Sequence, residues 1–165
     1  MKNIFILLIL LSSIFLSCKK LNDQSQSKNN GLSATITVSN DVKDRFKSHG
    51  RLFLFISESL YGEPREVTWP SSKYKTYIFA KNISDFKNSD SFVISDSNGW
   101  TSNTNLALGD VPKGKYVLQV LWDQDTSESR INAPGNIYSK TQTINIGELT
   151  KIDLELSQIV EDRIV

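Results

Sequence analysis

From Leu32 onward, short apolar or alternating runs are separated by Gly, Pro, Asn, Asp and Ser, and no helical periodicity lasts longer than two turns. Alternation with a period of two buries one side of an extended segment, so this pattern is typical of β-strands joined by turns. It predicts an all-β domain over residues 32–165. The number and spacing of the runs favour an immunoglobulin-like Greek-key β-sandwich of about seven or eight strands.

Two of the expected strands are central. The run Leu52–Ile56, LFLFI, is continuously apolar, as expected for a strand covered on both faces, and Tyr116–Trp122, YVLQVLW, is the strongest candidate for a second such strand. Shorter strands are expected over three further runs, 34–38, 74–80 and 91–94. The alternating runs 141–146 and 152–156, joined by residues 147–150, predict a terminal hairpin.

A local motif supports the sandwich. In VPKGKY, residues 111–116, a Pro/Gly turn directly precedes a strand that begins with tyrosine. This arrangement is similar to the tyrosine corner of Greek-key sandwiches, in which the phenol bonds to backbone a few residues upstream. We therefore assign structural roles to Gly114 and Tyr116, and expect the hydroxyl of Tyr116 to bond near residues 109–111.

The N-terminus has the features of a bacterial lipoprotein signal. Lys2 provides a positive charge, Ile4–Leu16 form an apolar run of 13 residues, and Ser17 precedes the only cysteine, Cys18. The run is shorter than the roughly 20 residues that span a bilayer as a helix. We predict a signal peptide over 1–17 and a thioether-linked lipid on Cys18, with further fatty acyl chains such as palmitate on the freed amine.

The lipoprotein box is imperfect, because Phe15 and Leu16 stand where Leu and a small residue are usual. The alternative is an ordinary secretory signal with an incidental cysteine. Residues 19–30, KKLNDQSQSKNN, are polar and lack aromatic or β-branched side chains. Such a segment buries too little apolar surface to offset its ordering entropy, so residues 18–31 are expected to form the lipidated cysteine and a flexible tether.

Composition excludes several functions. The 19 basic and 18 acidic side chains leave the chain near neutrality, which argues against nucleic-acid binding. With Cys18 acylated, no thiol remains for a disulfide or for cysteine-based metal or redox chemistry. We expect no cofactor, and a membrane contact made through the lipid anchor.

Catalytic signals are weak. The only histidine, His49, lies in a polar turn, and the chain has no Gly-x-Ser-x-Gly nucleophile motif. Asp123 and Asp125 have the spacing of an acidic calcium loop, but Glu128 and Pro134 occupy the positions where an EF-hand requires Gly and Glu. The two aspartates therefore remain only weak candidates for an irregular calcium site, against a solvated acidic loop.

Three tryptophans offer a different possibility. Trp122 ends the second central run and is expected in the core, whereas Trp69 and Trp100 lie among turn residues and are better candidates for exposure. Exposed indoles stack on sugar rings, although β-strands bury such residues just as readily. Trp69 and Trp100 are therefore weak candidates for ligand binding by a glycan-binding lipoprotein.

Four segments carry a family resemblance: GRLFLFI at 50–56, EPR at 63–65, DVPKGKYVLQV at 110–120 and APGNIYS at 133–139. Together they resemble the N-terminal β-sandwich of secreted, enterochelin-esterase-like bacterial hydrolases, over about residues 32–156. In those proteins the catalytic residues belong to a following hydrolase domain, so the resemblance implies none here. It implies an accessory role beside a hydrolase or its substrate.

The sequence thus predicts a lipid-anchored protein of the bacterial cell envelope, on the outer membrane by preference, facing the periplasm or the surface. The sandwich is expected to be a non-catalytic binding or accessory module, associated with a hydrolase. Two alternatives remain: the N-terminal portion of a lipoprotein esterase whose catalytic domain lies elsewhere, and a glycan-binding lipoprotein.

Overall fold

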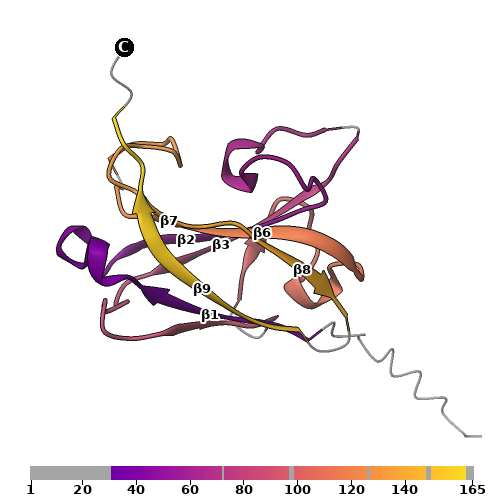
Figure 1. Cartoon of the computed structure of the whole chain (residues 1–165), viewed down its shortest axis with the longest axis horizontal. Coiled ribbons are helices and arrows are strands. Elements are labelled where there is room, and N and C mark those ends of the chain that lie inside the picture. Colours follow the sequence, from indigo (N-terminus) through magenta and orange to yellow (C-terminus); the bar gives the residue numbers. More distant parts are fainter. Residues whose placement is uncertain (1–30, 72, 97–98, 126, 148–149, 163–165) are drawn as a thin grey trace, which may run out of the picture.

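The computed structural model describes residues 31–162, apart from 72, 97–98, 126 and 148–149 (Figure 1). The described residues form nine strands: β1 Leu32–Val38, β2 Gly50–Ser57, β3 Thr76–Ile83, β4 Phe92–Ile94, β5 Thr101–Ser102, β6 Gly114–Asp123, β7 Ile137–Ser139, β8 Gln142–Ile146 and β9 Thr150–Ile159. Three short 3-10 helices connect them: η1 Asn40–Arg45, η2 Pro64–Glu66 and η4 Leu108–Asp110. The expectation of an all-β fold is confirmed.

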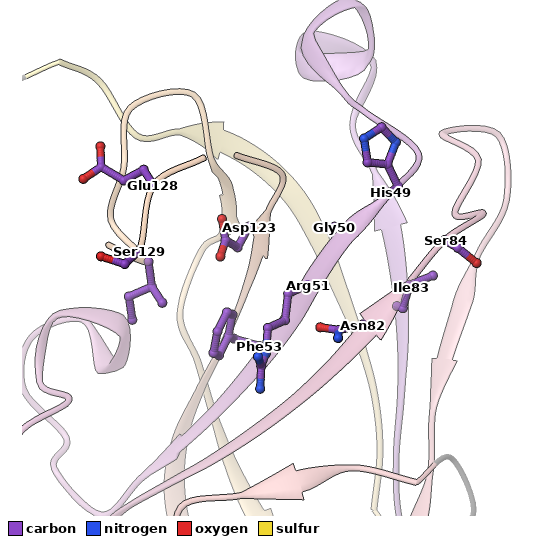
Figure 2. A pocket seen from close by; sticks show the side chains of 11 residues that line it. His49, Gly50, Arg51, Phe53, Asn82, Ile83, Ser84, Asp123, Glu128 and Ser129 are labelled. Atoms are coloured by element: carbon purple, nitrogen blue, oxygen red, sulfur yellow. The ribbon is translucent and has the colours of Figure 1, made fainter. Parts of the chain in front are cut away.

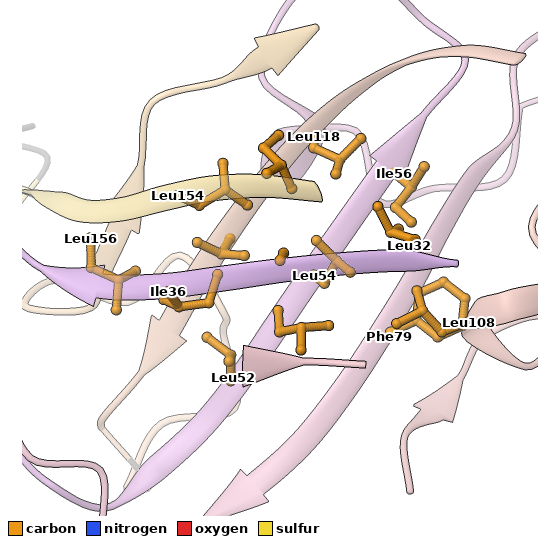
Figure 3. Packing of buried hydrophobic residues seen from close by; sticks show 14 of the residues in the cluster. Leu32, Ile36, Leu52, Leu54, Ile56, Phe79, Leu108, Leu118, Leu154 and Leu156 are labelled. Atoms are coloured by element: carbon orange, nitrogen blue, oxygen red, sulfur yellow. The ribbon is translucent and has the colours of Figure 1, made fainter. Parts of the chain in front are cut away.

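The strands form one curled sheet in the order β4-β1-β9-β7-β6-β2-β3-β5, with β8 paired to β6. β1 runs parallel to β9 and antiparallel to β4. β9 connects the two halves, because its first part pairs with β1 and its last residues pair with β7. The curl folds β1, β9 and β4 over β6, β2 and β3, which gives a sandwich-like arrangement (Figures 1 and 3).

The core lies between these two layers. Alternate residues of each strand point inward, so the predicted periodicity of two is what fills the interior. Figure 3 shows Leu154 and Leu156 of β9 and Ile36 of β1 above Leu52 and Leu54 of β2. Trp122 is fully buried at the end of β6, as expected, and its indole stacks on Phe46 at a centroid distance of 5.7 Å.

The tyrosine corner is present. The hydroxyl of Tyr116 donates to the Pro112 carbonyl at 2.9 Å, one residue after the expected acceptors, and the side chain is 3% exposed. Its ring meets Tyr77 edge-on at 6.2 Å. A Cβ on Gly114 would lie 3.3 Å from the Tyr116 ring, so glycine leaves room for the tyrosine to fold back over the turn.

The predicted terminal hairpin is wrong. β8 pairs with the first half of β6, from Gly114 to Leu118, whereas β9 pairs with β1 and β7. The connection after Ile146 therefore passes from one layer of the sandwich to the other. Alternation indicates which side of a strand is buried but does not determine which strand it pairs with. Pairing between two consecutive alternating runs therefore cannot be deduced from their pattern alone.

Other strand boundaries also differ from the predicted ones. β3 starts at Thr76 and extends to Ile83, and β9 continues to Ile159. The sequence does not predict the two-residue β5 or the three-residue β7, since neither lies in a periodic run of four or more residues.

Candidate functional site

An open groove of about 670 Å³ lies at the end of the sandwich where β2 begins and β6 ends (Figure 2). It lies on the outer face of the β3–β2–β6 part of the sheet. Glu128, Ser129 and Ile131 of the loop after β6 form one side, and Ile83 and Ser84, where β3 ends, form the other. The sheet therefore provides a rigid floor, and two loops provide the walls.

Three polar side chains form a row across the floor of the groove. Strand register places Arg51 of β2 opposite Asn82 of β3 and opposite Asp123 of β6. Because residues in register share one face of a sheet, the three side chains project from the same face, and Figure 2 shows the Arg51 side chain turned along β2 toward Phe53. The row presents hydrogen-bond donors and acceptors of both charges to one ligand.

An aromatic ring adds an apolar surface to the groove. Phe53, two residues along β2, lies on the same face as Arg51 and is half-buried. The Arg51 guanidinium lies 5.4 Å from the centroid of the Phe53 ring, and its Nη2 donates to Thr101 Oγ1 at 3.5 Å. These contacts orient a long charged side chain that is otherwise exposed.

Asp123 is a partly buried carboxylate of the groove. Burial raises its pKa, and this effect exceeds the opposing effects of the hydrogen bond from Asn136 and the nearby charge of Arg51. Asn136 Nδ2 donates to Asp123 Oδ1 at 3.0 Å. A hydrogen-bond donor from a bound ligand would favour the ionised form and so lower this pKa.

The neighbouring acidic residues are in a different environment. Ser127 donates its backbone N–H and its hydroxyl to Asp125 Oδ1, at 3.0 and 2.6 Å, and these bonds lower the pKa of Asp125. Arg130 donates to both carboxylate oxygens of Glu128 and lowers its pKa. Asp123 and Asp125, the weak calcium candidates, thus bond to different partners. In the part of the chain that the structure describes, no three His, Cys, Asp or Glu side chains gather as a metal site would require.

Gly50 allows β2 to approach the end of β6. A Cβ at this position would lie 2.4 Å from the Asp123 carbonyl oxygen and 2.9 Å from the Trp122 ring. Both distances are far below van der Waals contact, so only glycine fits at the inner edge of the groove. This explains the first residue of the GRLFLFI segment in structural terms.

A buried arginine holds the long β2–β3 connection against the outer face of β6. Arg65, in η2, is 8% exposed; its Nε donates to Glu63 Oε2 at 2.5 Å and its Nη1 donates to Asn132 Oδ1 at 2.8 Å. Its guanidinium lies 3.9 Å from the centroid of the Tyr138 ring. The backbone N–H of Arg65 also donates to Gln119 Oε1 at 3.2 Å.

These contacts bring together the segments EPR, VLQV and GNIYS, which lie far apart in the sequence. The functional reading of the sequence missed Arg65, because a charged residue in a polar stretch is expected to be solvated. The available signal was Gln119, a single polar residue in an apolar strand, which requires a buried partner.

The tryptophan candidates differ in their environment. Trp69 is 85% exposed, as expected, and borders a groove of about 300 Å³ with Thr68, Ser71, Tyr74 and Asn103. The exposure expected for Trp100 is not found. Its indole is half-buried, meets Phe92 edge-on at 6.5 Å and donates Nε1–H to the Ser95 carbonyl at 3.1 Å. A turn position did not imply exposure, because the Trp100 ring packs against the core beside Phe92.

The remaining sequence predictions concern His49 and the N-terminal segment. His49 is exposed at the rim of the groove, in the solvated turn expected for it. Cys18, the signal peptide and the expected tether up to residue 30 lie outside the described residues. Within the described ranges, no helix combines the length and the apolar character needed to cross a membrane.

The sequence matches no protein-family model and no curated protein, and the structure matches no solved structure.

Proposed function

We propose that this chain is a lipoprotein of the bacterial cell envelope, anchored through fatty acyl chains on Cys18, by preference to the outer membrane. Its β-sandwich is a binding or accessory module without catalytic activity of its own. The signal-like N-terminus and the single cysteine support the anchor. Two or more acyl chains give firm attachment, whereas one gives only marginal binding.

The groove at the start of β2 carries the binding role. Its row of Asn82, Arg51 and Asp123 faces one open space of about 670 Å³. A donor amide, a cation and a partly desolvated carboxylate beside an aromatic floor suit a polar segment of another protein better than an apolar small molecule. The partner that we propose is a hydrolase, because the chain resembles the accessory sandwich of enterochelin-esterase-like enzymes.

Cross-linking in cells tests the role of the groove. A photo-reactive amino acid at Asn82, which is exposed in the groove, is expected to capture one partner that is identified by mass spectrometry. The matched control places the same group at Asp153, an exposed residue of β9 outside the groove. Equal capture from both positions, or none from Asn82, contradicts the proposal. Hydrolysis of simple aryl esters by the purified domain would contradict its non-catalytic character.

Glycan binding remains a second candidate, favoured by one observation. Trp69 is almost fully exposed beside a small groove whose other lining residues include hydroxyl and amide groups. Stacking of a sugar ring on the indole with hydrogen bonds to these groups is a common mode of sugar recognition. A change of tryptophan emission on titration with soluble glycans, abolished in Trp69→Ala, would support this candidate. An unchanged emission would reject it.

A further inference from the structure

The β2–β3 connection concentrates the exposed apolar surface of the domain. In the described part of the chain, five large hydrophobic residues are exposed, and all but Val93 lie in this connection: Leu60 at 48%, Tyr61 at 82%, Val67 at 39% and Trp69 at 85%. Single exposed hydrophobic residues are normal on a protein surface, but a group of four that includes Trp and Tyr indicates an interaction site.

The exposed side chains lie on either side of two buried residues, Pro64 and Arg65. Arg65 bonds to Glu63, Gln119 and Asn132. The 60–61 and 67–69 segments therefore extend from a base that is anchored on β6. Charge-assisted hydrogen bonds hold this base against β6, and the apolar side chains on either side of it are exposed.

The β2–β3 connection begins at the end of the sandwich where the chain enters from the N-terminus. Leu32, the first residue of β1, lies opposite Thr150, which bonds through its Oγ1 to the Gly147 N–H at 3.2 Å. The adjacent Ile146 lies opposite Gly114 at the start of β6. Ser57, where the β2–β3 connection begins, lies opposite Val117, three residues further along β6. Figure 1 shows the connection above the layer of β2, β3 and β6, on the side of the sandwich opposite β1, and its residues Arg65 and Glu66 border a pocket with Glu161 and Asp162 near the C-terminus.

We propose that the segment 60–69 contacts the surface of the bilayer that carries the anchor, with Trp69 and Tyr61 at the level of the lipid headgroups. This inference rests on the proposed attachment through Cys18. Gly31 is thirteen positions after Cys18, so the entry point of the domain lies within about 45 Å of the acylated cysteine. Trp and Tyr are the residues enriched at membrane–water interfaces, because their rings are apolar and their N–H and O–H groups are polar.

Charge in this region indicates that the aromatic side chains carry the contact. Between Glu58 and Lys75 the described charged residues are three acidic and three basic: Glu58, Glu63, Glu66, Arg65, Lys73 and Lys75. A balanced segment has no net attraction to anionic lipids. The contact is therefore expected on zwitterionic phosphatidylcholine as well as on anionic membranes, and it is expected to resist added salt.

The contact orients the domain. Gly50 and Ser57, at the two ends of β2, are about 23 Å apart at 3.3 Å per residue. The groove with Arg51 and Asp123 lies at the Gly50 end, and the 60–69 segment follows the Ser57 end. The connection then returns along the outer face of β6, where Arg65 bonds to Asn132 beside Ile131 of the groove wall, so the groove lies on the same face as the 60–69 segment and borders it.

A synthetic anchor tests this inference separately from native acylation. Cys18 is the only cysteine, so the chain from Cys18 to Val165 can be coupled to maleimide-bearing lipid in phosphatidylcholine vesicles. The probe is quenching of tryptophan emission by phosphatidylcholine brominated in the upper acyl chain. We expect quenching in the coupled protein, and loss of this quenching in Trp69→Phe. Trp100→Phe is the matched control and is expected to retain it, because Trp100 is half-buried against Phe92.

The outcomes of this experiment distinguish a lipid bilayer from a soluble glycan as the ligand of the 60–69 segment. Equal emission of the coupled protein in brominated and ordinary lipid overturns the bilayer contact. Tryptophan emission that is equal in both lipids but changes when a soluble glycan is added also overturns the bilayer contact. It would assign Trp69 to sugar binding. Quenching that persists in Trp69→Phe also overturns the proposal, because another tryptophan would then be the one that meets the lipid. Failure of native acylation appears separately, in the mass of the protein extracted from its own membrane.

Discussion

Replacing Tyr116 by Phe isolates the tyrosine corner. The substitution removes one oxygen atom, which donates to the Pro112 carbonyl at 2.9 Å, and leaves the ring packed against Tyr77. A typical net hydrogen bond contributes about 0.5–1.5 kcal/mol to stability. Pro112 is exposed, so water can hydrate its freed carbonyl, and the expected loss is about 1 kcal/mol.

Urea unfolding at pH 7 measures this loss. For a domain of this size, with a slope of about 2 kcal/mol per molar urea, the midpoint is expected to fall by about 0.5 M. Tyr61→Phe is the matched control, because Tyr61 is 82% exposed, and it should unfold at the wild-type urea concentration at pH 7.

The pH dependence gives an independent check. Burial, followed by the nearby Tyr77 and Glu58, raises the pKa of Tyr116 to about 12, against an ordinary value of 10.0. A group whose pKa is raised by folding stabilises the native state fully below its unfolded pKa, and this stability is lost as the pH rises toward the folded pKa. By pH 11 the wild type should lose about 1.4 kcal/mol through Tyr116, a loss that the phenylalanine variant avoids.

The two proteins should therefore differ at pH 7 and unfold at nearly the same urea concentration near pH 11. A Tyr116→Phe midpoint equal to that of the wild type at pH 7 would show that the corner does not stabilise the sandwich. A difference that stays constant from pH 7 to pH 11 would refute the argument from burial of the phenol.

Two further substitutions test close contacts by urea unfolding. Gly50→Ala places a Cβ 2.4 Å from a backbone oxygen and is expected to cost about 2–3 kcal/mol, whereas Gly147→Ala, whose Cβ meets nothing within 4 Å, should resemble the wild type. Arg65→Ala removes a buried cation from Glu63 and is expected to cost about 3 kcal/mol, while Arg130→Ala breaks only an exposed pair and should leave the midpoint unchanged. A wild-type midpoint for Gly50→Ala or Arg65→Ala, or equal losses within either pair, would contradict the corresponding contact.

The sequence predicted those parts of the fold that depend on local patterns. The alternation of residues 34–38 and 152–156 indicated β1 and β9, the apolar run 52–56 indicated β2, and the VPKGKY turn indicated the tyrosine corner. The pairing of β8 with β6 was not predictable in this way, because the choice of partner depends on how the two layers close. The same limit explains the error at Trp100, whose partial burial results from the packing of its ring against Phe92.

The candidate site was less accessible to sequence reasoning. Arg51, Asn82 and Asp123 are separated by about 30 to 70 positions and become neighbours only through strand register. Asp123 was noticed for its spacing from Asp125, yet its structural partners are Asn136 and the groove. The environment of Arg65 likewise required three distant segments to meet, although Gln119 in an apolar run indicated that a polar partner was needed.

The central claim is the lipid anchor on Cys18, and the intact mass of the native protein tests it most directly. The protein is extracted with detergent from its own membrane and measured without chemical treatment. The account predicts a chain that begins at Cys18 and carries the added mass of a diacylglycerol, with or without a further acyl chain. A protein that carries no acyl mass, or that begins at a residue other than Cys18, would contradict it.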